Sequence, residues 1–514
     1  MRISTNQIQQ QGVNTMLDQQ VRLSKIQQQL ATGQRILTPA DDPAGASQAL
    51  DLTQAVAVNI QYQSNVDAAR TRLNLEESAL SDVTSLLQNV RTLAVQANNT
   101  TLSNSDRTSI AREIRQRLDE LLSLSNTKDG NGEYLFAGYK GQTQPFTRTS
   151  AGSYTYNGDQ GQRFLQVGPT RQVAADDSGT AVFQSIRNGN GTFTTLDNSA
   201  NTGSGVINTG TVSGTYTPDT YTLILGHKTS VAGGAIGLTD TGTNDTLQYE
   251  LRVNGALVYT AAEGSSRTQT QLVSDINAQS GTTGVRAYLD GGAIYLANTA
   301  PGTQAITVTE TLTGASEDGD TVTGYFGSAL TGVSSPSRTV TFSGAANGYV
   351  VTNLAGAVQT SGSYQSGANI NFSGVQTSVA GTPNNGDRFT LSTSANQDIF
   401  TTLQNMAVAL ETPVNGAAGQ AKFNNAMNRA LTDIDQSMNS ILVTTSGVGA
   451  RINAIDSQKA ANDAYTLQLQ QTLSTVQDLD YASAASQLNQ QLLALQAAQQ
   501  SFAKVQRLTL FDYL

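Results

Sequence analysis

The side chains best suited to chemistry are few and scattered along the sequence. Asp41 and Asp42 are adjacent carboxylates, and a carboxylate pair can act as general acid and base. The turns DGNGE at Asp129 and EDGD at Glu317 are rich in oxygen ligands but lack the twelve-residue pattern of a calcium loop. The single histidine, His227, is expected to be exposed in a turn. Because the sequence shows no pocket that would shift the pKa of these groups, we expect no catalytic residue, no cofactor and no metal.

The composition excludes several classes of partner. The chain has 514 residues, which predicts about three domains, and 29 Lys and Arg against 39 Asp and Glu give it a net charge of -10. A protein that binds nucleic acid needs a basic stripe, and the basic residues here are dispersed. No apolar run is long enough to span a membrane, and the first 30 residues lack the apolar core of a secretory signal peptide. We therefore expect neither nucleic acid nor membrane as partners.

Both ends of the chain have the periodicity of helices. A Gln-, Leu- and Ala-rich start extends to about residue 138. Between Leu52 and Ala97 apolar residues recur every seven positions in two series, which is typical of a coiled coil. One series contains Val66, Leu73, Leu80 and Leu87. Asn59 falls on this series and Glu76 on the other, and a polar residue at such a position fixes the register of the pairing at a cost in stability.

The C-terminal third repeats this helical pattern. One helix is expected to end before Pro413, a second extends from Phe423 to Ile441, and the last extends from Val448 to Val476. The apolar series of the last helix resumes at Leu488, Leu492, Leu495 and Phe502. Because an amphipathic helix cannot bury its apolar face alone, we expect the two helical ends to pack antiparallel.

The middle of the chain alternates with period two, which indicates strands. In LQYELRVNGALVY, alternate apolar residues are followed by Asn254-Gly255, a preferred two-residue hairpin turn. Short strands are also expected at YTLIL, AITVTE, RTVTF and DRFTLST, and a short helix around Leu272 and Ile276. The predicted fold class is α+β and multidomain: the N- and C-terminal helices form an antiparallel coiled coil or helical bundle, with β-rich outer domains inserted in the middle.

The stretch TGQRILTPADDPAGASQAL, residues 32–50, interrupts the first helical region. Gly33 suits the C-terminal cap of one helix, Pro39 cannot continue it, and Asp42-Pro43 places an N-cap acceptor before a proline at the first position of the next helix. As a local pattern, this stretch is equally compatible with an ordinary helix connection and with a specialised role.

The same stretch resembles the signature of the flagellin family. The residues that carry the match are Gly33, Arg35, Ile36, Asp41, Asp42, Ala44 and Gly45. The segments GNGEYLFAGYKGQTQPF and YTYNGDQGQRFLQVGP, and the C-terminal residues around Asp480-Tyr481-Ala482, are also similar to members of this family. The resemblance implies a structural subunit, without enzymatic activity, at the junction between the hook and the filament of the bacterial flagellum.

The resemblance and the composition together predict five regions. They are a terminal polymerisation domain of residues 1–40 and 485–514, a helical bundle of residues 41–138 and 394–484, a β-rich outer region of residues 139–246, a flagellin-type small β module of residues 247–310, and a β-rich return region of residues 311–393. The terminal segments have too few apolar residues to fold alone, so we expect them to become ordered on assembly. The expected assembly seam is Val66, Leu73, Leu80, Leu87, Leu488, Leu492, Leu495 and Phe502.

The implied partners are further copies of this chain in a ring or helix, a neighbouring hook-associated protein, flagellin, and an export chaperone bound to the C-terminal helix. The implied location is extracellular, on the flagellum, after secretion by the flagellar type III apparatus without a cleaved signal peptide. Two alternatives stay open. The chain can be the filament flagellin itself, or an exported enzyme or adhesin with a β-rich middle.

Overall fold

The computed structural model describes residues 5–150, 152–229, 236–237, 248–262, 265–314, 321–323, 326, 329–331 and 337–507. The chain divides into two compact units. Unit 1 comprises Met1–Asn74, Arg163–Ala175 and Gly449–Leu514, and unit 2 comprises Leu75–Gln162 and Asp176–Val448. The expected α+β class, with helical ends and a β-rich middle, is confirmed. The five regions expected from the sequence are functional assignments and stay a prediction.

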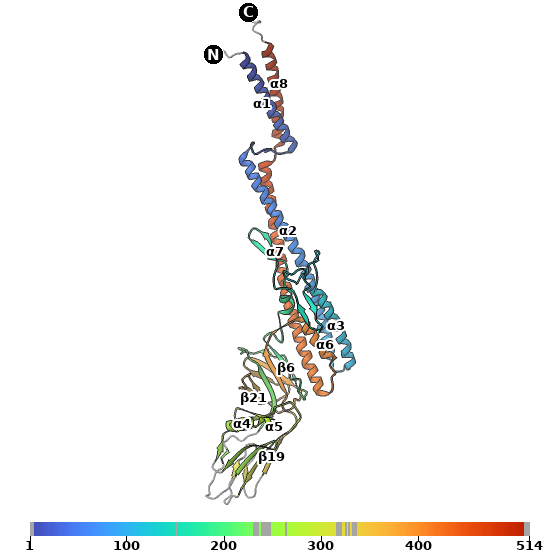
Figure 1. Ribbon diagram of the computed structural model, residues 1–514, viewed down its shortest axis with the longest axis vertical. Helices are drawn as coiled ribbons and strands as arrows, with labels where there is room; N and C mark the ends of the chain where they lie inside the picture. The colour runs from blue at the N-terminus through green and yellow to red at the C-terminus, as the bar shows by residue number, and fades with distance from the viewer. Residues whose placement is uncertain are drawn as a thin grey trace. The chain divides into compact units, whose positions relative to one another are not determined.

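Unit 1 is built from helices of both ends of the chain. It contains α1 (Thr5–Thr32), the first part of α2 (Pro43–Ala97), the last part of α7 (Gly416–Gln477), α8 (Tyr481–Arg507), and a hairpin of β3 (Phe164–Gly168) and β4 (Arg171–Ala174). Figure 1 shows α1 beside α8, coloured blue and red, and α2 beside α7. Both pairs are antiparallel, as the periodicity predicted.

A buried asparagine fixes the register of α2 and α7 in unit 1. The Nδ2 group of Asn59 donates to the carbonyl oxygen of Asn462 and to the hydroxyl of Thr466, each at 2.6 Å. The side chain of Asn462 in turn donates to the carbonyl oxygen of Val167 in β3, at 2.9 Å. Because a buried amide must find these partners, sliding either helix by one turn would leave polar groups unpaired.

The helices of unit 2 form a bundle around the continuation of the same apolar series. The bundle adds α3 (Asn104–Ser125) and α6 (Ile399–Glu411), which pack against each other, to the remaining parts of α2 and α7. Helix α3 begins with a capping box between Ser103 and Asp106. On α2, Leu80 and Leu87 are fully buried. Arg115 of α3 forms a two-fold ion pair with Glu411 of α6, at 2.6 Å for each bond.

The expected division of the C-terminal helices was wrong in one place. Residues 423–441 and 448–476 do not form two helices, because α7 is continuous through Gly447 and Gly449. The helix ends instead at Gln477, and α8 begins at Tyr481. No helix in the described part of the chain is long and apolar enough to cross a membrane.

The strands of unit 2 form antiparallel sheets. They are β1 (Phe146–Arg148), β2 (Tyr154–Tyr156), β5 (Ile186–Arg187), β6 (Phe193–Asp197), β7 (Val206–Ile207), β8 (Thr211–Val212), β9 (Tyr221–Lys228), β10 (Ile236–Gly237), β11 (Gln248–Val253), β12 (Ala256–Ala262), β13 (Ser266–Arg267), β14 (Val285–Asp290), β15 (Ala293–Asn298), β16 (Ile306–Thr313), β17 (Thr321–Thr323), β18 (Ala329–Thr331), β19 (Ser337–Phe342), β20 (Gly348–Thr352), β21 (Val358–Ser363), β22 (Asn369–Phe372), β23 (Val375–Ala380), β24 (Arg388–Thr393) and β25 (Asn396–Gln397). Three short helices, π-helix η1 (Thr180–Gln184), α4 (Gln269–Ala278) and α5 (Ser280–Thr283), lie between them.

Strand β9 is the centre of the largest sheet. It pairs with β15, β20 and β24, and the sheet has the order β14-β15-β9-β20-β21, with β24 joining β6 and β9. A second sheet has the order β12-β11-β16-β19. Smaller sheets pair β22, β23, β7 and β8, and two-stranded ladders pair β1 with β2, β3 with β4, β5 with β25, β10 with β13, and β17 with β18.

The predicted hairpin after residue 247 is present. Val253 pairs with Ala256, and both turn residues have positive φ, 52° at Asn254 and 83° at Gly255. Such angles define the two-residue turn that the Asn-Gly sequence favours. Tyr249, Leu251 and Val253 are buried, while Leu247 of the same predicted face lies outside the described residues. The short helix α4 covers this core with Leu272 and Ile276.

The prediction for His227 was wrong. This residue lies in β9, opposite Leu296 of β15, and is only 3% exposed. Its ring lies 5.8 Å from the ring of Phe342, and burial lowers the pKa of the imidazole. The local sequence Gly-His-Lys suggested a turn, but the strand continues through it because β20 pairs with Gly226 and β15 pairs with His227 and Lys228.

An aromatic cluster joins α6 to the start of the β-rich segment in unit 2. Phe136, Phe146, Phe183 and Phe400 are fully buried, and the ring of Phe400 lies 5.0 Å from that of Phe146 and 4.8 Å from that of Tyr154. These rings form a small core of unit 2 where the helical bundle meets the β-rich segment.

Phe400→Ala is expected to destabilise unit 2 by about 3–5 kcal/mol, because it leaves a cavity inside this cluster. Chemical unfolding followed by tyrosine circular dichroism would measure the loss, since the chain has no tryptophan. Val408→Ala, at an exposed position of the same helix, is the control and should cost little. Equal losses in both variants would contradict a packing role for the Phe400 ring.

Candidate assembly site

The connecting loop, residues 33–42, joins α1 to α2 in unit 1 and contains most of the family-signature residues. Gly33 ends α1 with a φ of +71°, and its N–H donates to the carbonyl oxygen of Gln29 at 2.8 Å. A side chain at this position would be strained by that φ and would bring its Cβ within 2.8 Å of the hydroxyl of Tyr481. Glycine is therefore required both by backbone conformation and by the approach of α8.

The connecting loop forms hydrogen bonds with the residues around the break between α7 and α8. The N–H of Arg35 donates to the carbonyl oxygen of Gln477 at 2.8 Å, and the N–H of Leu479 donates to that of Gly33 at 2.9 Å. The guanidinium of Arg35 also donates to the carbonyl oxygen of Val476, at 2.8 Å. The connecting loop and the end of α7 thus provide hydrogen-bond partners for each other's backbone groups. One of these is the carbonyl oxygen of Val476, which would otherwise have no partner at the end of its helix.

Asp41 organises the inside of the connecting loop. Its carboxylate accepts hydrogen bonds from the N–H groups of Leu37 and Thr38, at 3.1 and 3.0 Å, and pairs with the ammonium group of Lys25 at 2.6 Å. The bond to Lys25, followed by the bond to Thr38, lowers the pKa of Asp41 from 3.8 to about 2. This carboxylate therefore ties α1 to the loop.

Asp42 begins α2. Its Oδ1 atom accepts the N–H of Gly45 at 3.0 Å, which is the N-cap bond predicted from the sequence, and its Oδ2 atom lies 3.7 Å from the guanidinium of Arg35. A Cβ at Gly45 would lie 2.5 Å from this carboxylate and 2.8 Å from Cδ1 of the buried Ile36. Of the seven signature residues only Ala44 is exposed without such a contact. Five of the other six lie in the connecting loop, and Gly45 packs against it from the first turn of α2.

Beside the connecting loop, the surface of unit 1 is hollowed. A cavity of about 290 Å³ is lined by Ile36, Pro39 and the first turns of α2, including the exposed Leu50.

Asp129 lies elsewhere, in unit 2, where its carboxylate accepts the N–H groups of Asn131 and Glu133 within its own turn. Glu317 lies outside the described residues.

Helices α1 and α8 pack as an antiparallel pair, which we call the terminal hairpin. This pair buries only one side of each helix. On α8, Leu488, Leu495 and Phe502 are half-buried, and the ring of Phe502 lies so close to Gly12 that a Cβ there would be 2.9 Å away. Leu492, which the sequence placed on the same seam, is 44% exposed, and its neighbour Leu493 is 69% exposed. The structure thus brings three of the four predicted α8 residues toward α1 and leaves Leu492 turned away.

The seam residues of α2 are covered by the chain itself. Val66 and Leu73 in unit 1, and Leu80 and Leu87 in unit 2, have no exposed surface. They hold the helices of each unit together, and any part that they have in contacts between subunits is indirect and stays a prediction.

Sequence reasoning missed an apolar stripe on α1. Val13, Leu17 and Val21 recur every four residues and are 40%, 53% and 68% exposed. Met16, Leu23 and Leu30, which recur every seven residues, are the half-buried side of the same helix. The exposed apolar residues recur every four positions and the half-buried ones every seven. A simple count of apolar residues does not separate these two faces. The partner of Asp41, Lys25, was also missed, because nothing local links the two residues.

Asp41→Asn is expected to destabilise the connecting loop at neutral pH and to lose this effect in acid. Because the pKa of Asp41 is lowered in the folded chain, its contribution to stability is complete above about pH 4 and disappears as the pH falls toward 2. Thermal unfolding of the wild type and the variant should therefore differ at pH 7 and converge between pH 4 and pH 2. Asp51→Asn, at an exposed position of α2, is the matched control. A difference that persists undiminished at pH 2 would contradict this assignment.

The sequence and the fold of this chain are similar to those of known flagellar proteins. Residues 3–141 match the family model of the bacterial flagellin N-terminal helical region. The chain is 41% identical over 186 residues to flagellar hook-associated protein 3 of Escherichia coli (strain K12), which is 36% of this chain and 58% of that relative. It is 36% identical over 130 residues to phase 1 flagellin of Salmonella naestved, which is 25% of this chain and 26% of that protein.

The chain thus spans little more than half the length of the hook-associated relative. Among solved structures, the flagellar junction protein FlgL from Legionella pneumophila is similar with a TM-score of 0.56 and 25% identity, covering 84% of this chain and all of that one. Residues 3–141 are therefore similar to the bacterial flagellin N-terminal helical region, and the fold is similar to that of the flagellar junction protein FlgL from Legionella pneumophila.

Proposed function

We propose that this chain is a structural subunit of the bacterial flagellum, a hook-associated protein that joins the hook to the filament. Two facts support the junction over the filament itself: the sequence similarity covers a larger share of the hook-associated relative than of flagellin, and the fold is shared with a junction protein. The similar proteins are structural components of the flagellum, and the proposal assigns this chain no enzymatic activity.

The observation that carries the proposal is the uncovered apolar stripe of the terminal hairpin. Val13, Leu17 and Val21 on α1, and Leu492 and Leu493 on α8, are exposed in the isolated chain. Large apolar side chains that are exposed at regular spacing along one face of a helix favour contact with another protein. Because each helix of the hairpin has already used one side for its partner, the remaining apolar side is available to neighbouring subunits.

The proposal includes the partners implied by the family. They are further copies of this chain in a ring or helix, a neighbouring hook-associated protein, flagellin, and an export chaperone at the C-terminal helix. Residues 1–40 and 485–514 would form the polymerisation domain, with the other four predicted regions outside it. The proposed location is extracellular, on the flagellum, after export by the flagellar type III apparatus without a cleaved signal peptide. A hairpin with few fully buried large side chains suits passage in an unfolded state.

Deletion of the gene tests the proposed function. Loss of a junction subunit should leave hooks without filaments while flagellin accumulates in the medium, and the cells should not swim. If the chain is the filament flagellin, the medium should contain no filament monomers. If it is an exported enzyme or adhesin, filaments and swimming should be intact. Electron microscopy of the cells and immunoblots of the medium separate these outcomes.

Leu17→Asp is expected to abolish swimming and filament attachment, because a carboxylate in the apolar stripe would be buried without a partner on assembly. The change should leave the isolated chain folded, since Leu17 is more than half exposed. Gln11→Asp is the matched control, because it adds the same charge at an exposed position of α1 outside the stripe. Normal swimming of the Leu17→Asp strain, with wild-type export of the protein, would refute a role for the stripe in assembly.

A further inference from the structure

A second feature, in the β-rich part of unit 2, is a cavity of about 530 Å³. It lies between the faces of β9, β14 and β24, under α4 and the turn that joins β20 to β21. This volume falls in the range of small-molecule sites, about 300–1,000 Å³. None of the residues that line it belongs to the terminal hairpin or the connecting loop, so the proposed junction function leaves the cavity unexplained.

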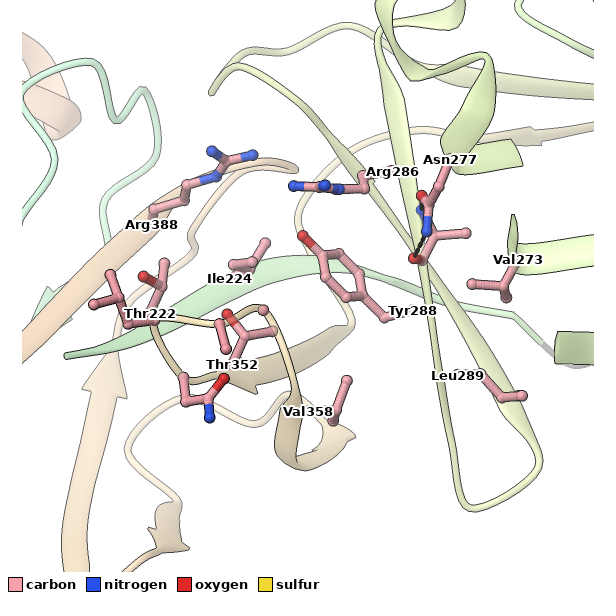
Figure 2. A pocket seen from close by; sticks show the side chains of 15 residues that line it. Thr222, Ile224, Val273, Asn277, Arg286, Tyr288, Leu289, Thr352, Val358 and Arg388 are labelled. Atoms are coloured by element: carbon pink, nitrogen blue, oxygen red, sulfur yellow. Dashed lines mark hydrogen bonds between the residues drawn. The ribbon is translucent and has the colours of Figure 1, made fainter. Parts of the chain in front are cut away.

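Two arginines from different strands converge at one side of this cavity. Arg286 comes from β14 and Arg388 from β24, and Figure 2 shows their guanidinium groups pointing toward one another above the hydroxyl of Tyr288. Burial raises the pKa of Tyr288, and the positive charges of Arg286 and Arg388 oppose the rise, which agrees with both cations lying close to this hydroxyl. The two guanidinium groups and the tyrosine hydroxyl are therefore three hydrogen-bond donors that face the same part of the cavity.

These arginines lack the carboxylates that other arginines of unit 2 have. Arg115 pairs with Glu411, and Arg91 pairs with Asp435 at 2.7 Å. Within the described residues, neither Arg286 nor Arg388 forms an ion pair. Arg388 donates one bond, from Nη2 to the carbonyl oxygen of Asn298 at 3.2 Å, and its buried Nε atom has no partner in the described structure. A guanidinium has five N–H donors, so most of those on Arg388 are left for a ligand.

The excess of cations is notable because the chain as a whole is acidic, with 39 Asp and Glu against 29 Lys and Arg. Two facing guanidinium groups repel each other unless an anion lies between them, and a carboxylate matches their planar donor pairs. The anion must be small enough to enter the cavity, which favours a ligand carboxylate over a side chain of a folded partner.

The rest of the cavity indicates what the carboxylate is attached to. Its floor alternates the hydroxyl groups of Thr222 and Thr352 with the aliphatic side chains of Ile224 and Val358 (Figure 2). The half-buried Asn353 and the exposed turn residues Leu354 to Gly356 form one wall. Hydroxyl and amide groups next to aliphatic side chains suit a ring that has both hydroxyl groups and C–H faces. The space is larger than phosphate or sulfate alone would need.

We propose that this cavity binds an acidic sugar, with its carboxylate between Arg286 and Arg388 and its ring on the floor formed by β9, β20 and β21. The sugar is either a free acid or a residue of a polysaccharide. A site of this kind in the β-rich insertion would give the subunit a binding activity separate from its structural role.

Calorimetric titration of the full-length chain tests this proposal. The probes are glucuronic acid and N-acetylneuraminic acid, with glucose and inorganic phosphate as controls and hyaluronan as a polymer that contains glucuronic acid. We expect saturable binding of at least one acid, none of glucose, and weaker or no binding of phosphate. Tighter binding of hyaluronan than of the free acid identifies a polysaccharide as the source, and binding of the free acid alone identifies a small molecule.

Arg286→Gln and Arg388→Gln should each weaken this binding about tenfold or more, because each removes a charged hydrogen-bond donor. Arg171→Gln, in β4 of unit 1, is the matched control and should bind as the wild type does. Arg286 is exposed, so its variant carries the test even if Arg388→Gln impairs folding. The proposal is overturned if neither acid binds, if glucose or phosphate binds as well as the acids, or if Arg286→Gln binds unchanged.

Discussion

Everything in this structure depends on one constraint: each amphipathic helix from one end of the chain buries its apolar face against a helix from the other end. In unit 1, Asn59 binds Asn462, 403 residues away, and in unit 2, Arg91 binds Asp435, 344 residues away. Neither half of such a pair can fold on its own, because its apolar stripe would remain in water. The β-rich middle is therefore an insertion whose two ends must return to paired helices.

The elements that rest on short-range periodicity could be predicted, and those decided by distant partners could not. The seven-residue series identified α2, and Asn254-Gly255 identified a hairpin. The continuity of α7 was missed because Gly447 and Gly449 suggest a break. Each glycine costs a helix about 1 kcal/mol, whereas burying a side chain such as Ile441 or Val448 gives about 1.5–3 kcal/mol. Burial therefore outweighs the local preference.

The candidate site divides in the same way. The caps of the connecting loop, at Gly33 and Asp42, could be predicted because they involve residues within a few positions. The bonds of Arg35 to Val476 and Gln477 join opposite ends of the chain, and no local pattern announces them. The break between α7 and α8 contains no glycine or proline, so it also has no local signal. The break lies where the backbone groups of Gln477 and Leu479 form hydrogen bonds with the connecting loop.

The attachment of the β-rich insertion in unit 2 explains how the two proposed functions can occur in one chain. Its first and last strands, β5 and β25, pair side by side, with Ile186 opposite Gln397. The N–H of Gly189 donates to the carboxylate of Asp433 on α7 at 2.7 Å, which fixes this neck to the helical bundle. Because entry and exit are adjacent, residues between them can change without altering the spacing of the helices. The proposed assembly constrains the helices, while the proposed ligand constrains only the cavity inside the insertion.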